Sequence, residues 1–414
     1  MIYFSDFGIT KRFGMGCPFS LSMTLSLPQI IQLEKDYEVP LYAKRGISMS
    51  KGTGIYLFDT QGKRYIDCMT NIGVNSLGYG NKEISVAIAE QIERLPSCHQ
   101  SFYSEERVLL LQELHDILPA SLTKIIFTNS GAEAVEAALK LARAVTGKKT
   151  FIAAVNSYHG RTFGALSATG QEKYRLPFLP LLPEFIHVPF NDIPAIESAI
   201  TGDTAAIILE PIQGEGGIIL PQKEYLKKVK HLCETKQILL IADEVQSAIR
   251  TGSWLASEQY DCIPDIVCIA KSFSYGLPFG FVATTQSLAE AMPKGSHGST
   301  FAGYPVACTA AAKVIQYIKQ HDLLSNVAIV GKYFMQQLQS IDSPVIKEVR
   351  GKGLMIGLEL TEPPTPYLKK MQEHGLIAMP TSGNTIRFLP PITFSKENVD
   401  EVMQIMHKIF LMKC

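Results

Sequence analysis

Gln237-Ile-Leu-Leu-Ile-Ala242 and Asp265-Ile-Val-Cys-Ile-Ala270 are short runs of almost uninterrupted apolar residues. Such runs are typical of strands that are covered on both faces of a parallel sheet. Similar runs occur at 124–128, 150–155, 204–209 and 281–285, and helical apolar spacing occupies 132–145 and 225–236. Strands that alternate with helices predict an α/β fold with a mostly parallel central sheet and helices on both faces.

The length of 414 residues suffices for two or three domains. The alternating pattern covers about 75–315, which we expect to form a large domain. A hairpin-like pattern lies within 36–74. The last part, 316–414, contains helical stretches at 323–338 and 396–411 and strand-like runs at 345–349 and 354–360. We expect these two segments to build a smaller α+β domain, with 1–35 as an N-terminal extension.

The composition argues against several classes of protein. Lys plus Arg and Asp plus Glu both number 39, so the chain lacks the basic excess of a general nucleic-acid binder or of an electrostatic membrane binder. No apolar run approaches the roughly 20 residues that span a bilayer. The eight cysteines form no Cys-x-x-Cys pair, so we expect no metal ribbon and interpret them as reduced thiols of a cytoplasmic protein.

Polar residues follow three of the expected strands. Asp243 follows 237–242 and Lys271 follows 265–270, and ligands of parallel sheets bind outside the carboxyl ends of strands. A structural salt bridge would explain this pair equally well in isolation. Asn129-Ser-Gly-Ala132 precedes a helix, where free backbone N–H groups and the positive helix end favour an anion. An ordinary helix cap is the alternative for that segment.

Together, these three strand ends meet the needs of a pyridoxal phosphate site. Lys271 can form the Schiff base, Asp243 can keep the pyridine nitrogen protonated, and Ser130 with the helix end can hold the phosphate. Tyr158 and His159 follow the strand at 150–155. A tyrosine at that point either stacks on a planar cofactor ring or packs at the rim.

Two arginines are candidate carboxylate binders. Arg161 follows the same strand and can clamp a carboxylate with two hydrogen bonds. Arg387 lies among apolar residues in Thr385-Ile-Arg-Phe-Leu-Pro390, where an unpaired guanidinium is costly to bury, so it needs a ligand carboxylate or a glutamate. Glu215 lies in Gln213-Gly-Glu-Gly-Gly217, which is either a functional loop or a structural turn.

These residues stand in motifs that resemble those of the class-III (subgroup II) aminotransferases, which are fold-type I pyridoxal phosphate enzymes. The resemblance covers about residues 40–412 and is closest to acetylornithine and ornithine/lysine-type ω-aminotransferases. It implies that 75–315 is the cofactor-binding domain. The matching motifs are Asn129-Ser-Gly-Ala-Glu-Ala134, Tyr158-His-Gly-Arg-Thr162, Glu210-Pro-Ile-Gln-Gly-Glu-Gly-Gly217, Ala242-Asp-Glu-Val-Gln246, Arg250-Thr-Gly252, Ala270-Lys271, Ser299-Thr-Phe301 and Arg350-Gly-Lys-Gly353.

The resemblance implies a role for each matching position. Lys271 corresponds to the lysine that binds the cofactor and moves the proton, Asp243 to the partner of the ring nitrogen, and Gln246 to the neighbour of the phenolic oxygen. Thr300 corresponds to a residue that reaches the phosphate of the partner subunit, so a homodimer with shared active sites is expected. The other cofactor-binding positions are Ser130, Gly131, Ala132, Tyr158 and His159.

The resemblance also implies the substrates. Arg161 and Arg387 correspond to carboxylate binders, and Glu215 to a gate that pairs with Arg387 until 2-oxoglutarate enters. Tyr42 stands where ornithine- and acetylornithine-type members carry a substrate-side tyrosine. Ile72 replaces a second tyrosine of ornithine δ-aminotransferases, which favours N-acetylornithine or 4-aminobutyrate over free ornithine. We therefore expect ping-pong transfer of an ω-amino group to 2-oxoglutarate, giving a semialdehyde and glutamate.

Several alternatives stay open. The donor can be 4-aminobutyrate, ornithine or lysine, and aminomutases and decarboxylases of this fold share the lysine, the aspartate and the phosphate cradle. Ser272-Phe-Ser-Tyr-Gly-Leu-Pro278 and Ala302-Gly-Tyr-Pro305 depart from the usual family pattern, so a non-catalytic binding protein of the same fold is a further alternative. A dinucleotide dehydrogenase is disfavoured, because no Gly-x-Gly-x-x-Gly follows an early strand.

Overall fold

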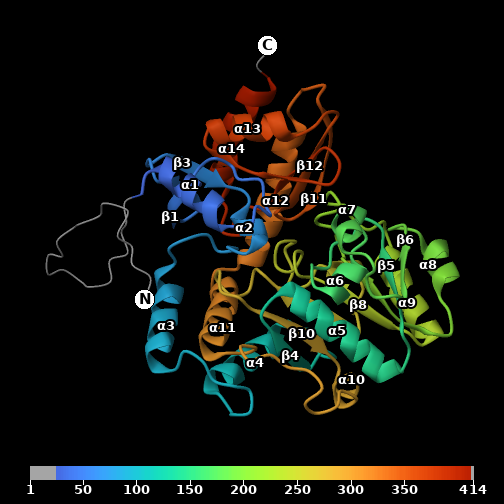
Figure 1. The fold of residues 1–414 in the computed structure, drawn as a ribbon. Helices are drawn as coiled ribbons and strands as arrows, with labels where there is room; N and C mark the ends of the chain where they lie inside the picture. Colours follow the sequence, from blue (N-terminus) through green and yellow to red (C-terminus); the bar gives the residue numbers. More distant parts are fainter. Residues whose placement is uncertain (1–24, 412–414) are drawn as a thin grey trace.

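A computed structural model describes residues 25–411 of the chain. Its described strands form one seven-stranded sheet and two four-stranded sheets (Figure 1). The large sheet has the order β4-β10-β9-β8-β7-β5-β6. Its strands are β4 (Lys124–Thr128), β5 (Thr150–Ala154), β6 (Phe185–Val188), β7 (Thr204–Leu209), β8 (Leu239–Asp243), β9 (Ile266–Ala270) and β10 (Gly280–Thr284).

The large sheet is mostly parallel, as the sequence predicts. Strands β9, β8, β7, β5 and β6 pair in parallel, whereas β10 runs antiparallel to both β9 and β4. Strand β6 is not predicted from the sequence. Strand β8 starts two residues later than expected and includes Asp243, so that this carboxylate is the last residue of the strand.

Helices cover both faces of the large sheet. Helix α5 (Gly131–Thr146) packs its alanine-rich side on one face, in a cluster with Ala153, Ile208 and Cys268. Helices α8 (Ile193–Ala199) and α9 (Tyr225–Lys236) cover the other face. They pack in a cluster with Ile207 and Leu240, whose side chains point to this face of the sheet. The alternation along each strand explains the continuous apolar runs, because both sets of side chains are buried.

A third cluster joins the β9–β10–β4 end of the sheet to the helices beside it and to the small sheets. These helices are α3 (Lys82–Arg94), α4 (Glu105–Ile117), α11 (Pro305–Gln320) and α12 (Leu323–Gln339). The shorter helices are α2 (Thr70–Gly73), α6 (Phe163–Ala168), α7 (Glu172–Arg175), α10 (Gln286–Glu290) and the 3-10 turns Leu176–Phe178 and Ser257–Tyr260.

The two small sheets combine segments from both ends of the chain. One contains β1 (Met49–Thr53), β2 (Tyr56–Asp59) and β3 (Arg64–Asp67), with β13 (Leu376–Ile377) paired in parallel to β3. The other is antiparallel and has the order β11-β12-β15-β14. Its strands are β11 (Ile346–Lys352), β12 (Met355–Leu360), β14 (Met379–Thr381) and β15 (Thr385–Phe388), with helices α13 (Thr365–Glu373) and α14 (Lys396–Phe410) beside them.

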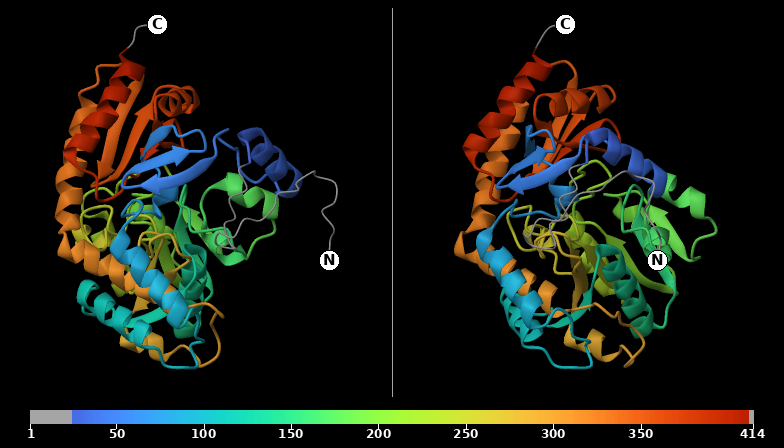
Figure 2. Two further views of the ribbon diagram at one scale, coloured as in Figure 1. Left: turned by 90° about the vertical axis from the view of Figure 1, so that its left-hand side faces the viewer. Right: turned by 60° about the vertical axis from the view of Figure 1, so that its left-hand side comes forward.

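Helix α1 (Leu27–Tyr37) is not predicted from the sequence and has no buried residue. It lies beside the blue strands at the edge of the molecule (Figure 2). The rest of the expected extension, 1–24, lies outside the described residues. None of the helices within 25–411 is long and apolar enough to cross a membrane. The six cysteines in this range are free thiols.

Helix α12 makes a close backbone contact that allows no side chain. A Cβ on Gly331 would lie 2.1 Å from the carbonyl oxygen of Gly353, in the loop between β11 and β12. We expect Gly331→Ala to destabilise the protein by about 1–3 kcal/mol in chemical denaturation, because two backbone segments must separate. Gly202→Ala is the control, since nothing lies within 4 Å of that position. Equal stability of the two variants would contradict this account of the packing.

Candidate active site

A cavity of about 160 Å³ lies at the carboxyl ends of the parallel strands. Its walls come from the residues that follow β5, β7, β8 and β9 and from the first turn of α5. Seven of the predicted site residues line it, together with two that sequence reasoning did not select, Glu210 and Val245. The seven are Gly131, Ala132, Tyr158, His159, Asp243, Gln246 and Lys271.

Lys271 follows β9 directly and has a left-handed backbone, with φ of 54°. A residue with a Cβ is strained there, and such strain is typical of functional positions. Burial lowers the pKa of the Lys271 amine to about 8. The Arg387 charge acts in the same direction, whereas Glu215, Asp243 and Glu210 oppose it. The amine is therefore partly neutral near physiological pH, as a nucleophile or proton carrier requires.

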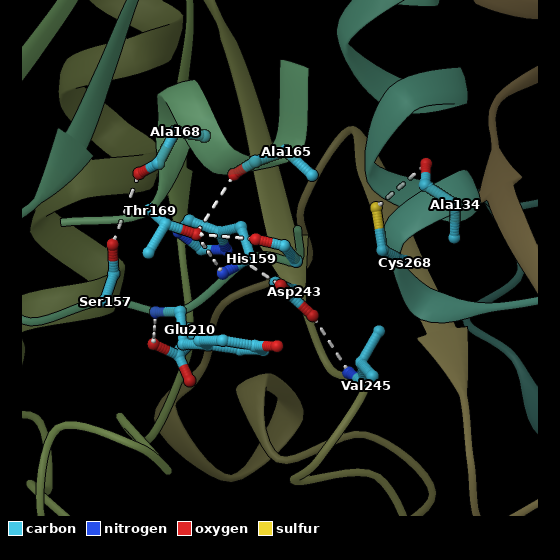
Figure 3. A network of polar contacts seen from close by, with 12 residues as sticks. Ala134, Ser157, His159, Ala165, Ala168, Thr169, Glu210, Asp243, Val245 and Cys268 are labelled. Carbon is cyan, nitrogen blue, oxygen red and sulfur yellow. Dashed lines mark hydrogen bonds and ion pairs between the residues drawn. The ribbon is translucent and has the colours of Figure 1, made fainter. Parts of the chain in front are cut away.

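Asp243 and His159, which both line the cavity, form a buried pair (Figure 3). Asp243 Oδ2 lies 2.7 Å from His159 Nδ1, and Asp243 Oδ1 accepts the Val245 backbone N–H at 3.1 Å. A carboxylate only accepts hydrogen bonds, so the proton of this contact belongs to Nδ1 of the imidazole. The His159 backbone N–H donates to Thr169 Oγ1. The segment after β5 and the end of β8 are thus joined by a direct side-chain contact.

The first turn of α5 lines the cavity with free backbone N–H groups that can hold an anion. Ser130 is its N-cap, and Ser130 Oγ accepts the Glu133 N–H at 3.2 Å, so the hydroxyl proton is still available to a ligand. A Cβ on Gly131 would lie 2.7 Å from a methyl group of Val245, which explains the glycine. The capping role and the ligand-binding role are therefore compatible.

Tyr158 lines the cavity, and its ring meets Tyr174 edge to face, with 5.6 Å between the ring centroids. Arg161 is exposed. Its guanidinium lies 4.3 Å from the Tyr174 ring centroid, and its Nε donates to the Tyr158 hydroxyl at 3.3 Å. In this arrangement, Arg161 packs on the rim of the site and does not line the cavity itself.

Arg387 lies on β15 and is fully buried. Its Nη2 donates to Glu215 Oε1 at 2.6 Å and its Nη1 to Gln246 Oε1 at 2.9 Å, whereas Nε has no partner within the described chain. Burial raises the pKa of Glu215, but the charge and the hydrogen bond of Arg387, together with the charges of Lys271 and Lys173, outweigh this effect and hold the pKa below its usual value. The glutamate partner that the sequence indicates for Arg387 is therefore Glu215.

Two predicted site residues, Thr300 and Tyr42, do not line the cavity, nor does Ile72, where the family tyrosine is absent. Thr300 is exposed on the loop before α11. Tyr42 is 67% exposed and lines a separate cavity of about 730 Å³ under α1. Ile72 is half-buried and belongs to a left-handed turn with Thr70 and Asn71, at φ of 48–57°.

The unusual segment after Lys271 is tied to the chain before α3. The Tyr275 hydroxyl accepts the Asn81 N–H at 2.6 Å. Ser76 Oγ donates to the Ser272 carbonyl at 2.6 Å, and Ser272 Oγ donates to the Gly73 carbonyl at 3.1 Å. Ser272 and Tyr275 thus anchor this loop to the chain before α3, while the Lys271 side chain lines the cavity.

The donor set of the cavity fits pyridoxal phosphate. It offers one amine, a carboxylate, helix N–H groups without internal partners and an aromatic ring, each from a different strand end or the adjacent helix. Lys271 would hold the aldehyde carbon, Asp243 the ring nitrogen, and Ser130 with Gly131 and Ala132 the phosphate.

Comparisons with known proteins agree with this site. The family model Aminotransferase class-III matches residues 41–410. The acetylornithine aminotransferase of Methanosarcina mazei is 42% identical over 92% of this chain and 95% of its own length. A Pyrococcus furiosus protein that carries the name LysW-aminoadipate semialdehyde/glutamate semialdehyde transaminase is 42% identical over 87% of this chain and 95% of its own.

Among solved structures, an ornithine aminotransferase of Toxoplasma gondii with pyridoxal phosphate at partial occupancy superposes with a TM-score of 0.89. It is 30% identical and the match covers 93% of this chain and 94% of that one. The chain therefore belongs to the class-III aminotransferases. It is a pyridoxal phosphate-dependent transaminase of fold-type I.

The pKa of Lys271 predicts a pH dependence of stability in the cofactor-free protein. Between pH 8 and 10.5, the folded amine is neutral whereas the unfolded amine is protonated, so unfolding takes up a proton and stability rises with pH. We expect this rise, of roughly 3 kcal/mol, in the wild type and its loss in Lys271→Met. Denaturant unfolding at several pH values measures it. Parallel pH profiles of the two proteins would contradict the lowered pKa.

Proposed function

We propose that this transaminase moves the ω-amino group of N-acetylornithine, or of a closely related amine, to 2-oxoglutarate. The observation that carries the proposal is the buried contact of Arg387 with Glu215 and Gln246. A buried guanidinium must have a negative partner, and Glu215 provides one from a glycine-rich loop. When a dicarboxylate enters, its own carboxylate can replace Glu215 at Arg387.

This exchange explains how one pocket accepts two different substrates. An ω-amino donor presents no carboxylate at its reacting end, so Arg387 stays paired with Glu215. The keto acid presents one, and Arg387 can bind it with two parallel hydrogen bonds. Arg161, held on the face of Tyr174, is the second carboxylate binder that we propose, at the rim of the site.

Bound pyridoxal phosphate supplies an electron sink for the carbon that loses its proton. Lys271 carries that proton, since its pKa of about 8 lets the amine both accept and release a proton near neutral pH, and the residue lines the cavity. Asp243 holds a negative charge at the base of the cavity, where His159 fixes the orientation of its carboxylate. Gln246 lines the cavity and accepts a hydrogen bond from Arg387, so that it connects the cavity to the Arg387–Glu215 pair.

The choice of donor rests on the relatives and on one sequence position. The Methanosarcina mazei relative is named for acetylornithine, and the isoleucine at 72 offers no hydroxyl to a free α-amino group. The Pyrococcus furiosus relative is named for other semialdehydes, so donors of different length belong in the test. 4-Aminobutyrate, ornithine and lysine are the alternatives.

A homodimer with shared active sites is part of the proposal. Thr300 is exposed and does not line the cavity of its own subunit. This position suits a residue that completes the phosphate site of the partner subunit. The neighbouring Phe301 is exposed, and Phe102 and Tyr103 on the loop before α4 are exposed as well. Apolar surface of this kind is typical of an interface between subunits. A cytoplasmic location also stays a prediction.

The donor is identified by titration of the purified holoenzyme. N-acetylornithine, ornithine, 4-aminobutyrate, lysine and putrescine are added separately while the absorbance of the bound cofactor is followed. We expect N-acetylornithine to change the spectrum at the lowest concentration and 2-oxoglutarate to restore it. A spectrum that responds to no amine would overturn the proposed reaction, and a stronger response to another donor would replace N-acetylornithine.

Substitution of Arg387 should separate the two halves of the reaction. Removing the guanidinium costs the keto acid a charged partner, so we expect Arg387→Ala to slow the 2-oxoglutarate half-reaction by at least about 30-fold in single-turnover absorbance measurements. The donor half-reaction should slow much less. Glu215→Gln is the matched control, because it removes the gate charge and leaves Arg387 free for the keto acid. Equal losses in both halves of Arg387→Ala would argue against the exchange.

A further inference from the structure

Glu210 is a buried carboxylate that lines the cavity and to which no role has been given above. It is 5% exposed and follows β7, between the residues that end β5 and β8. Figure 3 shows it close to His159 and Asp243. A buried glutamate without a cationic partner is costly, so its two oxygens must find hydrogen-bond donors.

Both oxygens of Glu210 accept backbone N–H groups from different loops. Oε2 accepts the Tyr158 N–H at 2.9 Å, and Oε1 accepts the Gly214 N–H at 3.1 Å. Tyr158 begins the turn that carries the aromatic wall and His159, and Gly214 directly precedes Glu215. The one carboxylate therefore links the wall of the cavity to the loop of the Arg387 gate.

The loop around Glu215 has other tethers, but they do not change charge near neutral pH. Gln213 Nε2 donates to the Val155 carbonyl at 2.9 Å, and Thr381 Oγ1 donates to the carbonyls of Gly214 and Glu215 at 3.1 and 2.9 Å. Arg350 donates to the Gly217 carbonyl at 2.7 Å. Among these contacts, only the one made by Glu210 involves a group that can gain a proton in this range.

We propose that Glu210 is a positioning residue that holds the Glu215 loop against the Tyr158 turn only while it is ionised. A protonated carboxyl has one good acceptor oxygen, and its hydroxyl presents a hydrogen to the second N–H. One of the two amides then loses its partner, and the loop that presents Glu215 to Arg387 loosens. The effect on the pairing of Glu215 with Arg387 rests on the proposed function. The loss of a hydrogen bond at Tyr158 or Gly214 does not depend on it.

The charged groups around Glu210 set the pH at which this happens. Burial raises the pKa of Glu210 to about 7, and Asp243 raises it as well, whereas His159 and the two amides lower it. Lys271 faces it from the end of β9, where Glu210 contributes to the charge balance of the amine. Ionised Glu210 therefore predominates above pH 7, and the loosened loop predominates below it.

Hydrogen exchange of the full-length holoenzyme tests the proposal, with mass spectrometry of peptides that cover 157–160 and 212–217. After correction for intrinsic exchange rates, we expect exchange in one or both segments to rise about tenfold between pH 8 and pH 6, which corresponds to the loss of one hydrogen bond. Glu210→Gln should exchange fast at both pH values, since its amide group offers one acceptor and a donor.

Two further variants keep the result interpretable. Glu258→Gln is the matched control, because Glu258 also accepts a backbone N–H, from Leu255 at 3.3 Å, outside the cavity, and it should keep the wild-type pH step. Thr381→Val removes a tether that does not titrate, so it should exchange faster at both pH values and retain the step. If Glu210→Gln does not fold, the proposal is tested by whether amide exchange changes between pH 8 and pH 6 in the wild type and in Thr381→Val. Exchange without a pH step in the wild type, or an unchanged step in Glu210→Gln, overturns the proposal.

A kinetic measurement distinguishes the positioning role of Glu210 from the proposed exchange of Glu215 at Arg387. If Glu210 positions Glu215, the KM for 2-oxoglutarate should fall about threefold as the pH drops from 8 to 6, because Arg387 is released more easily. Glu210→Gln should show the low KM at both pH values. A pH step in exchange without a step in KM upholds the positioning of the amides and contradicts the gate.

Discussion

Parallel pairing of β7, β8 and β9 is the constraint on which the site depends. Leu209 is paired with Ala242 and Asp243 with Cys268, so the three strands end at nearly the same level. These ends carry Glu210 after β7, Asp243 as the last residue of β8, and Lys271 after β9. A shift of one residue in either pairing would exchange the two faces of a strand and move these charged residues relative to one another. The continuous apolar cores of these strands thus fix where the charged groups meet.

The buried charges around the cavity are stabilised by different sets of partners. Asp243 has an imidazole and an amide, Glu210 has two amides, and Arg387 has a carboxylate and a side-chain amide. In each case, hydrogen bonds within the protein replace those that water would make to the charged group. The charged groups at the cavity wall can still interact with a ligand. The shifted pKa values of Lys271 and Glu210 follow from the same burial.

The apolar runs were sufficient to predict most of the central sheet, because strands buried on both faces carry a strong local signal. The antiparallel direction of β10 and the short edge strand β6 were not predictable, since direction depends on pairing and an edge strand needs fewer apolar residues. The rule that ligands lie after the strands found Asp243 and Lys271. Applied to 204–209, the same rule would also have found Glu210. Thr300 and Tyr42 lie apart from the cavity, and local sequence patterns do not show where such loop residues lie relative to a site.

The pairing of β3 with β13 links residues that lie about 300 positions apart in the chain. The Ile66 N–H donates to the Gly375 carbonyl at 2.8 Å, and the Cys68 N–H donates to the Ile377 carbonyl at 2.8 Å. During synthesis, the hairpin of β2 and β3 leaves the ribosome long before its partner strand exists. At roughly 5–20 residues per second, its open edge waits roughly 15–60 s for that partner. The nascent chain is therefore exposed to mispairing and to chaperones at its beginning, although the finished enzyme has this edge covered.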